Sequence, residues 1–339
     1  MSGPFSLGDS LRVYRLQHLG IRLDLERGLM QSQTPLWEAW LALLTQQAMG
    51  QPTYVRCDPQ EGEAFVQVRY RAHEAAADVA YLAPSVAEDR RASHAWLALL
   101  DSACTDVATR GVQRVFANLP ERGCEVDVFH QAGFALYAGE DIYRRAHLHT
   151  QGPNESTLHL RPQRLEDWPA LQKLCVAITP QRVRQAEGGI SVATDTGRYC
   201  QRYLLSSANG EDLIAALTLC TRGLAHWMRV LVHPEAQIPV EGLIRWGLDR
   251  LAAQPARPVF CSVRRYEGGV RVPLETAGFE LYAARALMVK HTVAWLKAPI
   301  QELVPTLKGG AEPVPPAYHI SGETEIPVAT GRLAVERKP

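Results

Sequence analysis

A seven-residue phrase that occurs twice constrains this chain more than any other feature of its sequence. The first copy, from Ala132 to Ala138, reads AGFALYA, and the second, from Ala277 to Ala283, reads AGFELYA. The copies differ at one position and lie much further apart than the roughly 20 to 50 residues of solenoid and propeller repeats. The chain has 339 residues, which exceeds the about 100 to 200 of a usual domain. The phrase therefore indicates a duplicated domain.

Matching segments precede both copies of the phrase. An apolar triplet lies upstream of each, at Val115–Ala117 and at Val259–Cys261, and a polar helix-like stretch follows it. Further upstream, an apolar run ends in proline in both halves, at Val79–Pro84 and at Met228–Pro234. The shared order is strand, proline-marked turn, helix, strand, helix, Gly-Phe and strand. This order predicts two copies of one α/β (α+β) fold.

Periodicity in the first half predicts three helices and five strands before the phrase ends. Strands are expected at Leu11–Leu16, Thr53–Arg56, Ala64–Arg71, Ala76–Ala83 and Val112–Ala117. Helices are expected from Pro35 to about Ala48, from about Glu88 to Thr109, and from Glu125 to Gln131. Three successive short strands imply an antiparallel meander.

A polar join between about Ala146 and Ser156 separates the halves. In the second half, strands are expected at Leu158–Pro162, Leu213–Cys220 and Leu224–Val232, and helices at Asp167–Val176, near Tyr199–Ser206, at Val240–Ala252 and at Val270–Thr276. After about His291 the pattern dissolves into a proline-rich tail.

The order of elements, the two Gly-Phe phrases and the opening phrase LRPxxxxDW, from Leu160 to Trp168, together resemble the GNAT superfamily of N-acetyltransferases. The resemblance extends from about Leu11 to His291. It implies a tandem protein of two GNAT-like domains, each a mixed, mostly antiparallel sheet flanked by helices. The expected boundaries are 1–150, 151–291, and 292–339 for a partly irregular extension.

The resemblance implies acetyl-CoA as acyl donor. The family's phosphate loop reads Gln/Arg-x-x-Gly-x-Gly/Ala, because glycine lets phosphate oxygens approach backbone N–H groups at a helix start. The nearest match in the second half runs from Gln237 to Gly242, with Val240 at the middle glycine, and in the first half from Arg90 to Ala95. The expected cofactor-binding residues are therefore Val230, Leu231, Val232, Gln237, Val240 and Gly242, the first three holding the pantetheine arm.

Acid and base candidates are sparse. The family often has a tyrosine four residues before the glycine of Gly-Phe, as the acid for the leaving thiolate, but here Phe129 and Leu274 occupy those positions. A base must deprotonate the acceptor ammonium, and a histidine titrates near neutrality. His226, on the strand before the second loop, is therefore the expected catalytic residue, and Asp78 is the weaker analogue in the first half.

Composition excludes several other classes of function. Lys plus Arg and Asp plus Glu both total 36, so there is no global positive field for nucleic acid or an anionic membrane. The seven cysteines are scattered without a Cys-x-x-Cys pair, which argues against a disulfide framework and a zinc site and favours buried thiols in a reducing cytoplasm. No apolar run reaches about 18 residues. We expect a cytoplasmic protein without metal.

The function expected from these observations is an acyl-CoA-dependent N-acetyltransferase that moves the acetyl group from acetyl-CoA to a primary amine of unknown identity. The second domain is the preferred catalyst, and the partner is a small-molecule or peptide amine. A homodimer is one alternative for the oligomeric state. The alternative is a catalytically inactive GNAT-fold scaffold, which both degenerate loops and both missing tyrosines favour. An open divergence of strands between Val230 and Gly242 would favour the enzyme, and a filled one would favour the scaffold.

Overall fold

The computed structural model of the chain describes residues 2–46, 50–59, 62–72, 74–88, 92–146, 158–189, 199–207 and 212–292. All of these residues belong to one compact unit. The expected join and nearly all of the expected tail lie outside the described residues, as do Arg90 and Arg91 of the first phosphate loop.

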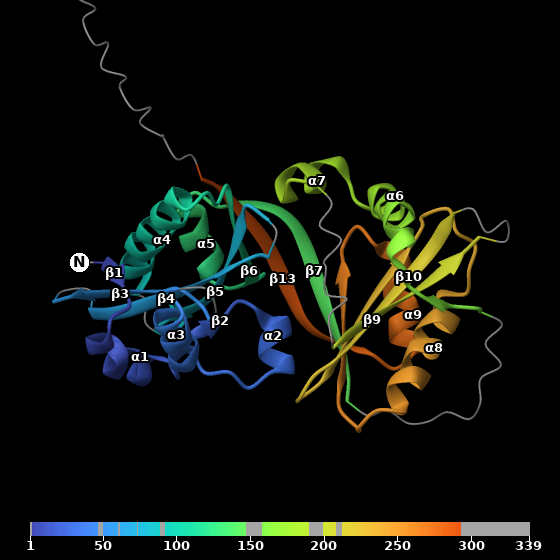
Figure 1. Cartoon of the computed structure of the whole chain (residues 1–339), viewed down its shortest axis with the longest axis horizontal. Helices are drawn as coiled ribbons and strands as arrows, with labels where there is room; N and C mark the ends of the chain where they lie inside the picture. The colour runs from blue at the N-terminus through green and yellow to red at the C-terminus, as the bar shows by residue number, and fades with distance from the viewer. Residues whose placement is uncertain are drawn as a thin grey trace, which may run out of the picture. The chain divides into compact units, whose positions relative to one another are not determined.

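The described strands form one continuous mixed sheet (Figure 1). Its order is β1-β3-β4-β5-β6-β13-β7-β12-β11-β10-β9-β8, and β2 pairs with β5 off this path. The strands of the first half are β1 (Ser2–Pro4), β2 (Ile21–Arg22), β3 (Thr53–Asp58), β4 (Gly62–Tyr70), β5 (Ala76–Ala83), β6 (Arg114–Pro120) and β7 (Ala135–Arg145). Those of the second half are β8 (Arg161–Pro162), β9 (Cys200–Ser206), β10 (Leu213–Thr221), β11 (His226–Val232), β12 (Val259–Arg264) and β13 (Glu280–His291).

The described α-helices and short 3-10 helices, labelled η, lie on both faces of this sheet. They are η1 (Leu7–Asp9), α1 (Ser10–Leu16), α2 (Leu25–Met30), α3 (Pro35–Leu44), α4 (Ala92–Thr109), α5 (Glu125–Gln131), η2 (Leu165–Asp167), α6 (Trp168–Ile178), α7 (Gln181–Glu187), α8 (Val240–Ala252), η3 (Gly268–Val270) and α9 (Arg271–Thr276). In the second half, α8 packs through Leu243 and Ile244 onto one face of the sheet, and α6 packs through Leu171 and Leu174 onto the other.

The two halves exchange their last strands. β13 of the second half pairs antiparallel with β6 of the first half, and β7 of the first half pairs antiparallel with β12 of the second. β7 and β13 also pair with each other, so the two long strands lie side by side at the centre of the sheet (Figure 1). Each half of the sheet is therefore completed by a strand from the other half.

The repeated phrase is a helix C-cap followed by a strand. Gly133 and Gly278 end α5 and α9 with φ of 86° and 79°, the left-handed region in which glycine carries no steric penalty. The next amide closes the cap in both copies, since Phe134 N–H donates to the Phe129 carbonyl and Phe279 N–H donates to that of Leu274. Both phenylalanine side chains are buried. Capping and core packing together explain why Gly-Phe occurs twice.

The antiparallel meander β3-β4-β5 and the helices α3, α4, α5, α6, α8 and α9 are confirmed, with boundaries shifted by a few residues in some of them. The strand expected at Leu11–Leu16 is wrong, because these residues form α1. The Ser6–Asp9 capping box starts η1, which leads directly into α1. That helix buries Val13 alone.

The helix expected near Tyr199–Ser206 is also wrong, because this segment is β9. Tyr203 and Leu205 pack with the α8 side of the sheet, and Leu204 packs with the α6 side. A strand covered on both faces has no alternation of apolar and polar residues, so its sequence is not distinguishable from that of a helix by period alone.

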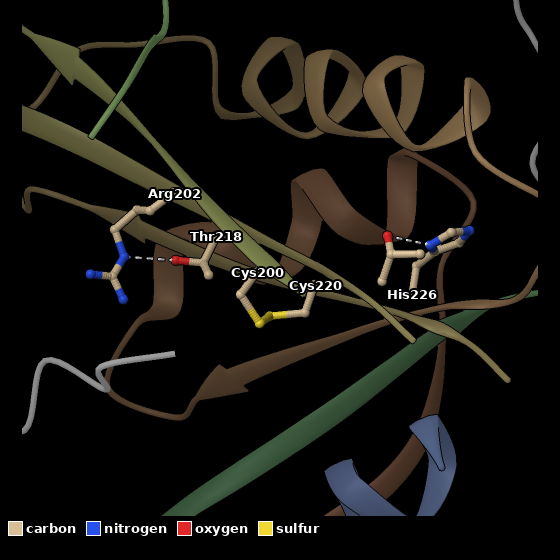
Figure 2. The surroundings of a disulfide bond; sticks show 6 residues. Cys200, Arg202, Thr218, Cys220 and His226 are labelled. Atoms are coloured by element: carbon tan, nitrogen blue, oxygen red, sulfur yellow. Dashed lines mark hydrogen bonds between the residues drawn. A yellow bond between two sulfur atoms is a disulfide. The ribbon is translucent and has the colours of Figure 1, made fainter. Parts of the chain in front are cut away.

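The expectation that all cysteines are free thiols is wrong for two of them. Cys200 and Cys220 form a disulfide between β9 and β10, with a Cα–Cα distance of 4.0 Å (Figure 2). They face each other in the register, and the flanking pair carries the hydrogen bond from Thr221 N–H to the Tyr199 carbonyl. Positions between such hydrogen-bonded pairs bring side chains closest. Cys57 and Cys124 are exposed thiols, and Cys104, Cys175 and Cys261 are buried.

Among the described helices, none combines the length and the apolar character needed to cross a bilayer.

Candidate functional site

The strands β11 and β12 diverge in the second half. They pair in parallel from His226 with Val259 to Arg229 with Ser262, and the pairing ends there although β11 continues to Val232. His226 N–H donates to the Pro258 carbonyl on the β12 side, whereas His233 N–H donates to that of Ile214 on the β10 side. Successive residues of a strand direct their backbone N–H and C=O groups to opposite edges. The carbonyl of Val230 and both backbone groups of Val232 therefore face the edge of β11 from which β12 has diverged.

The first half has the same divergence, but its own chain occupies it. The parallel pairing of β5 with β6 ends at Asp78 and Phe116, whereas β5 continues to Ala83. One edge of that continuation pairs with β4, and the other pairs with β2, with Ile21 opposite Leu82 and Arg22 opposite Tyr81.

The segment from Leu19 to Asp24 holds this edge along its length. The amides of Leu23 and Asp24 donate to the Ala80 carbonyl, and the Leu19 carbonyl accepts from Ser85 N–H. Arg285 of β13 donates to the Leu23 carbonyl at 3.1 Å. An added Cβ at Gly20 would lie 2.4 Å from the Tyr81 ring and 2.5 Å from the Leu82 carbonyl oxygen. The backbone groups of β5 are thus already paired within the chain.

Helix α8 begins directly after the divergence of β11 and β12. Pro239 is its N-cap without a side-chain cap, and the first helical bond runs from Leu243 N–H to the Pro239 carbonyl. Helix geometry therefore leaves the N–H groups of Val240, Glu241 and Gly242 without an intrahelical acceptor. Arg245 forms an ion pair with Glu241 one turn along the helix. This pair offsets the negative charge of the Glu241 carboxylate near the positive end of the helix. Gln237, Val240 and Gly242 thus lie together at one helix start.

His226 lies at the other end of β11. Its side chain is fully buried. Its Nε2 is 3.1 Å from the Pro255 carbonyl, which can only accept, so Nε2 carries the proton and Nδ1 accepts from the Thr221 hydroxyl at 3.0 Å. Burial lowers its pKa. Figure 2 shows the disulfide between His226 and the Arg202–Thr218 pair. The catalytic role of His226 stays a prediction, and the contacts seen here hold the β11 start in place.

A polar row crosses the sheet at the last paired residues of β11 and β12. Arg202, Thr218, Arg229 and Ser262 are register partners on four neighbouring strands. Arg202 Nε donates to the Thr218 hydroxyl at 3.0 Å (Figure 2) and Nη1 to Gln163 at 3.1 Å. Arg229 Nη2 lies 3.8 Å from Glu267 Oε1, beyond hydrogen-bond distance. Two cations and one carboxylate therefore meet where the strands part.

Glu267 follows β12 and turns back to its end. Its Oε2 accepts from Arg264 N–H at 2.9 Å, and its side chain is 4% exposed. Burial raises the pKa of Glu267 against the opposing effect of Arg229 and Arg264, and the charge of Glu140 adds to the increase. A buried carboxylate with a raised pKa near a point of strand divergence is a candidate proton acceptor.

A network of ion pairs links this region to the first half and to α7. Arg264 lies 3.3 Å from Glu140 of β7 and 3.6 Å from Glu187 of α7. The Tyr137 hydroxyl donates to Glu187 at 3.2 Å, and Glu140 accepts from Asn118 of β6. The first half thus supplies side chains to the surroundings of the second half's divergence.

The remaining candidates of the first half have structural surroundings. Asp78 accepts from both Arg69 and Arg71, and these arginines hold its pKa below the usual range despite burial, which makes it a weak base. Phe129 and Leu274 are fully buried in the two main cores. A phenol at either position would need a buried hydrogen-bond partner.

A pocket of about 460 Å³ lies elsewhere, between the ends of β7 and β13 and the helices α8 and α9. Its lining includes Arg144, Arg145, Arg245 and Tyr282 but no residue of the β11–β12 divergence or of the first turn of α8. The strand divergence that defines the candidate site is therefore separate from this pocket. Within the described residues, no group of three or more His, Cys, Asp or Glu side chains could hold a metal ion.

Sequence reasoning missed Glu267. The signal for Glu267 is its place after a buried strand and before Gly268 and Gly269, since polar side chains at strand ends commonly line sites.

The fold is that of the GNAT N-acetyltransferases. In this chain it is a mixed sheet flanked by helices, in which β11 diverges from its parallel neighbour β12 before the start of α8. The chain is similar to a GCN5-related N-acetyltransferase from Sphaerobacter thermophilus, with a TM-score of 0.54 at 14% identity over 86% of this chain and 95% of that one. It is also similar to a tandem GNAT protein from the clavulanic acid biosynthesis pathway, with a TM-score of 0.50 at 15% identity over 87% of this chain and 99% of that one. No protein-family model matches the chain, and no curated protein sequence matches it.

Proposed function

We propose that the chain is an acyl-CoA-dependent N-acyltransferase with one active site, in the second half, that moves an acetyl group from acetyl-CoA to a primary amine. The observation that carries the proposal is the difference between the two divergences. In the first half, the edge of β5 is paired with residues of the chain itself. In the second half, β11 continues for three residues past its pairing with β12 and leads into the uncapped start of α8.

The residues at this divergence fit the two ends of the donor. The backbone groups of Val230 and Val232 that face away from β10 offer hydrogen bonds to the amides of a pantetheine arm. The N–H groups of Val240, Glu241 and Gly242 offer donors to a pyrophosphate, which the positive helix end also favours. Leu231 packs on the α6 side of the sheet, so its contribution is to hold β11 in place.

The reaction needs little beyond this arrangement. The acceptor nitrogen forms a bond to the thioester carbonyl carbon, the carbon–sulfur bond breaks, the nitrogen loses a proton, and the thiolate of CoA gains one. Holding amine and thioester together supplies much of the rate, and a backbone N–H at the divergence can stabilise the tetrahedral oxyanion. The absence of a tyrosine at Leu274 is therefore compatible with activity.

Calorimetric titration with acetyl-CoA and with free CoA tests this proposal, because it counts the sites per chain. We expect one site, and we expect Gly242→Trp to abolish it while the melting temperature stays close to that of the original protein. An added Cβ at Gly242 meets neighbours no closer than 3.5 Å, so the loss would come from the bulk of the indole at the helix start. Gly223→Trp is the matched control, since nothing lies within 4 Å of that position.

No binding at millimolar CoA would reject the enzyme and favour the alternative of an inactive scaffold. Two sites per chain would reject the assignment to one half, because the second site would have to displace β2 from β5.

A further inference from the structure

Arg229 lies between two covered regions on the α6 face of the sheet. Leu231, two residues further along β11, packs against α6, and Trp227, two residues before, packs in a cluster with Met30 of α2. Side chains two apart on a strand share a face, so Arg229 points to that face between the two helices. Its side chain keeps 34% of its exposure.

The guanidinium of Arg229 has little to bind in the protein. Within the described residues its ion-pair partner is Glu267, whose Oε1 lies 3.8 Å away, too far for a hydrogen bond. The neighbouring arginines differ. Arg202 donates to Thr218 and Gln163, and Arg264 is only 15% exposed and lies between two carboxylates, at 3.3 and 3.6 Å. A guanidinium carries five donors in a planar fork that matches a carboxylate. Arg229 is thus the more exposed cation at this point of the sheet, with donors that a ligand can use.

Glu267 is fixed beside it. One oxygen, Oε2, is held by Arg264 N–H, and the other, Oε1, faces Arg229. The site therefore offers a cation and an anion side by side at the point where β11 and β12 part. An α-amino acid carries an anion and a cation separated by one carbon, so its two charges are complementary to those of Arg229 and Glu267.

We propose that the acceptor is an α-amino acid whose carboxylate binds Arg229 and whose amine lies at Glu267 Oε1. The proposal rests on the acyltransferase function proposed above and specifies the class of its acceptor. Glu267 takes one proton from the ammonium, and the neutral nitrogen attacks the thioester carbon. The tetrahedral intermediate then expels CoA thiolate, which takes a proton from the new amide nitrogen as the C–S bond breaks. Deprotonation of Glu267 by solvent restores the site.

Amino-acid binding is measured by calorimetry, with each of the twenty standard L-α-amino acids titrated into the full chain with and without saturating CoA. For each amino acid that binds, kcat/KM with acetyl-CoA is compared with that of its α-amide. We expect at least one to bind, with a preference for the acid over the amide of roughly 10- to 150-fold, the range for hydrogen bonds to charged groups.

Arg229→Gln should reduce this preference to about one while CoA binding stays unchanged. Arg229→Lys keeps the charge and should retain part of the preference, which decides the matter if the glutamine variant fails to fold. Arg271→Gln is the control, because Arg271 pairs only with Glu275 within the described residues and lies on the exposed side of α9.

The outcomes separate the two proposals. CoA binding without heat from any amino acid, or an acid preference that survives in Arg229→Gln, would overturn the acceptor assignment and leave the acyltransferase intact. Absence of CoA binding would reject the acyltransferase, and the titrations without CoA would then show whether Arg229 binds an amino acid at all.

Discussion

Removal of the Cys200–Cys220 disulfide should destabilise the second half by about 3 kcal/mol. The bond closes a loop with a sequence separation of 20 residues, and the loss of closure entropy for a loop of this length corresponds to about 3 kcal/mol at 25 °C. For a chain of this size, about 2 °C of melting temperature is lost per kcal/mol. The double variant Cys200→Ala, Cys220→Ala should therefore melt roughly 6 °C below the oxidised protein, with a lower urea midpoint.

Thiol titration in denaturant gives an independent measure of the same bond. The protein isolated without reductant should show five reactive thiols, because five of the seven cysteines lie outside the disulfide, and seven after reduction. The matched control is Cys57→Ser with Cys124→Ser, which changes two exposed thiols and should alter stability by less than about 0.5 kcal/mol. Seven free thiols before reduction, or equal urea midpoints for the double variant and the oxidised protein, would refute the reasoning.

Three further changes probe the cap, the filled divergence and the proton acceptor. Gly278→Ala should cost about 1–2 kcal/mol in urea unfolding, the strain of a left-handed alanine, whereas Gly268→Ala, with nothing within 4 Å and no positive φ, should cost far less. Gly20→Ala should cost about 1–3 kcal/mol, because its Cβ would meet Tyr81 and Leu82, and calorimetry should find CoA affinity unchanged. For Glu267, the base must be deprotonated, so kcat/KM should rise with pH through a pKa above the usual 4.5, and Glu267→Gln should abolish this limb. A pH profile unchanged in Glu267→Gln would contradict its role.

The repeated phrase carried enough information to predict the fold. Gly133 and Gly278 mark left-handed caps, and Phe134 and Phe279 mark the cores beside them, so local chemistry and packing agree at these positions. In the segments whose secondary structure was predicted wrongly, local chemistry and packing do not agree in this way. At Leu11–Leu16, apolar residues alternate as in a strand, and the helix start depends on Ser6 and Asp9, which precede the segment.

Contacts across the sheet could not be predicted from the sequence. β2 has two residues, Ile21 and Arg22, too few for a strand pattern in the sequence, and the Leu23 carbonyl that follows it accepts from Arg285, 262 residues further along the chain. The same holds for Cys200 and Cys220, which become neighbours only through the register of β9 and β10. His226 has the residue type of a general base, but burial and two hydrogen bonds are properties of its surroundings and not of its sequence position.

The strand exchange explains how a repeat whose own divergence is filled can still matter for a site in the other repeat. β7 of the first half pairs with β12 and carries Glu140, which faces Arg264. Arg264 in turn donates the N–H that fixes Glu267. In the opposite direction, β13 of the second half carries Arg285, which holds the Leu23 carbonyl in the segment that fills the first divergence. Each half therefore positions residues at the strand divergence of the other half. The second half, through Arg285, helps to keep the β5–β6 divergence filled. The first half, through Glu140, supports the charges at the β11–β12 divergence, which remains available to a ligand.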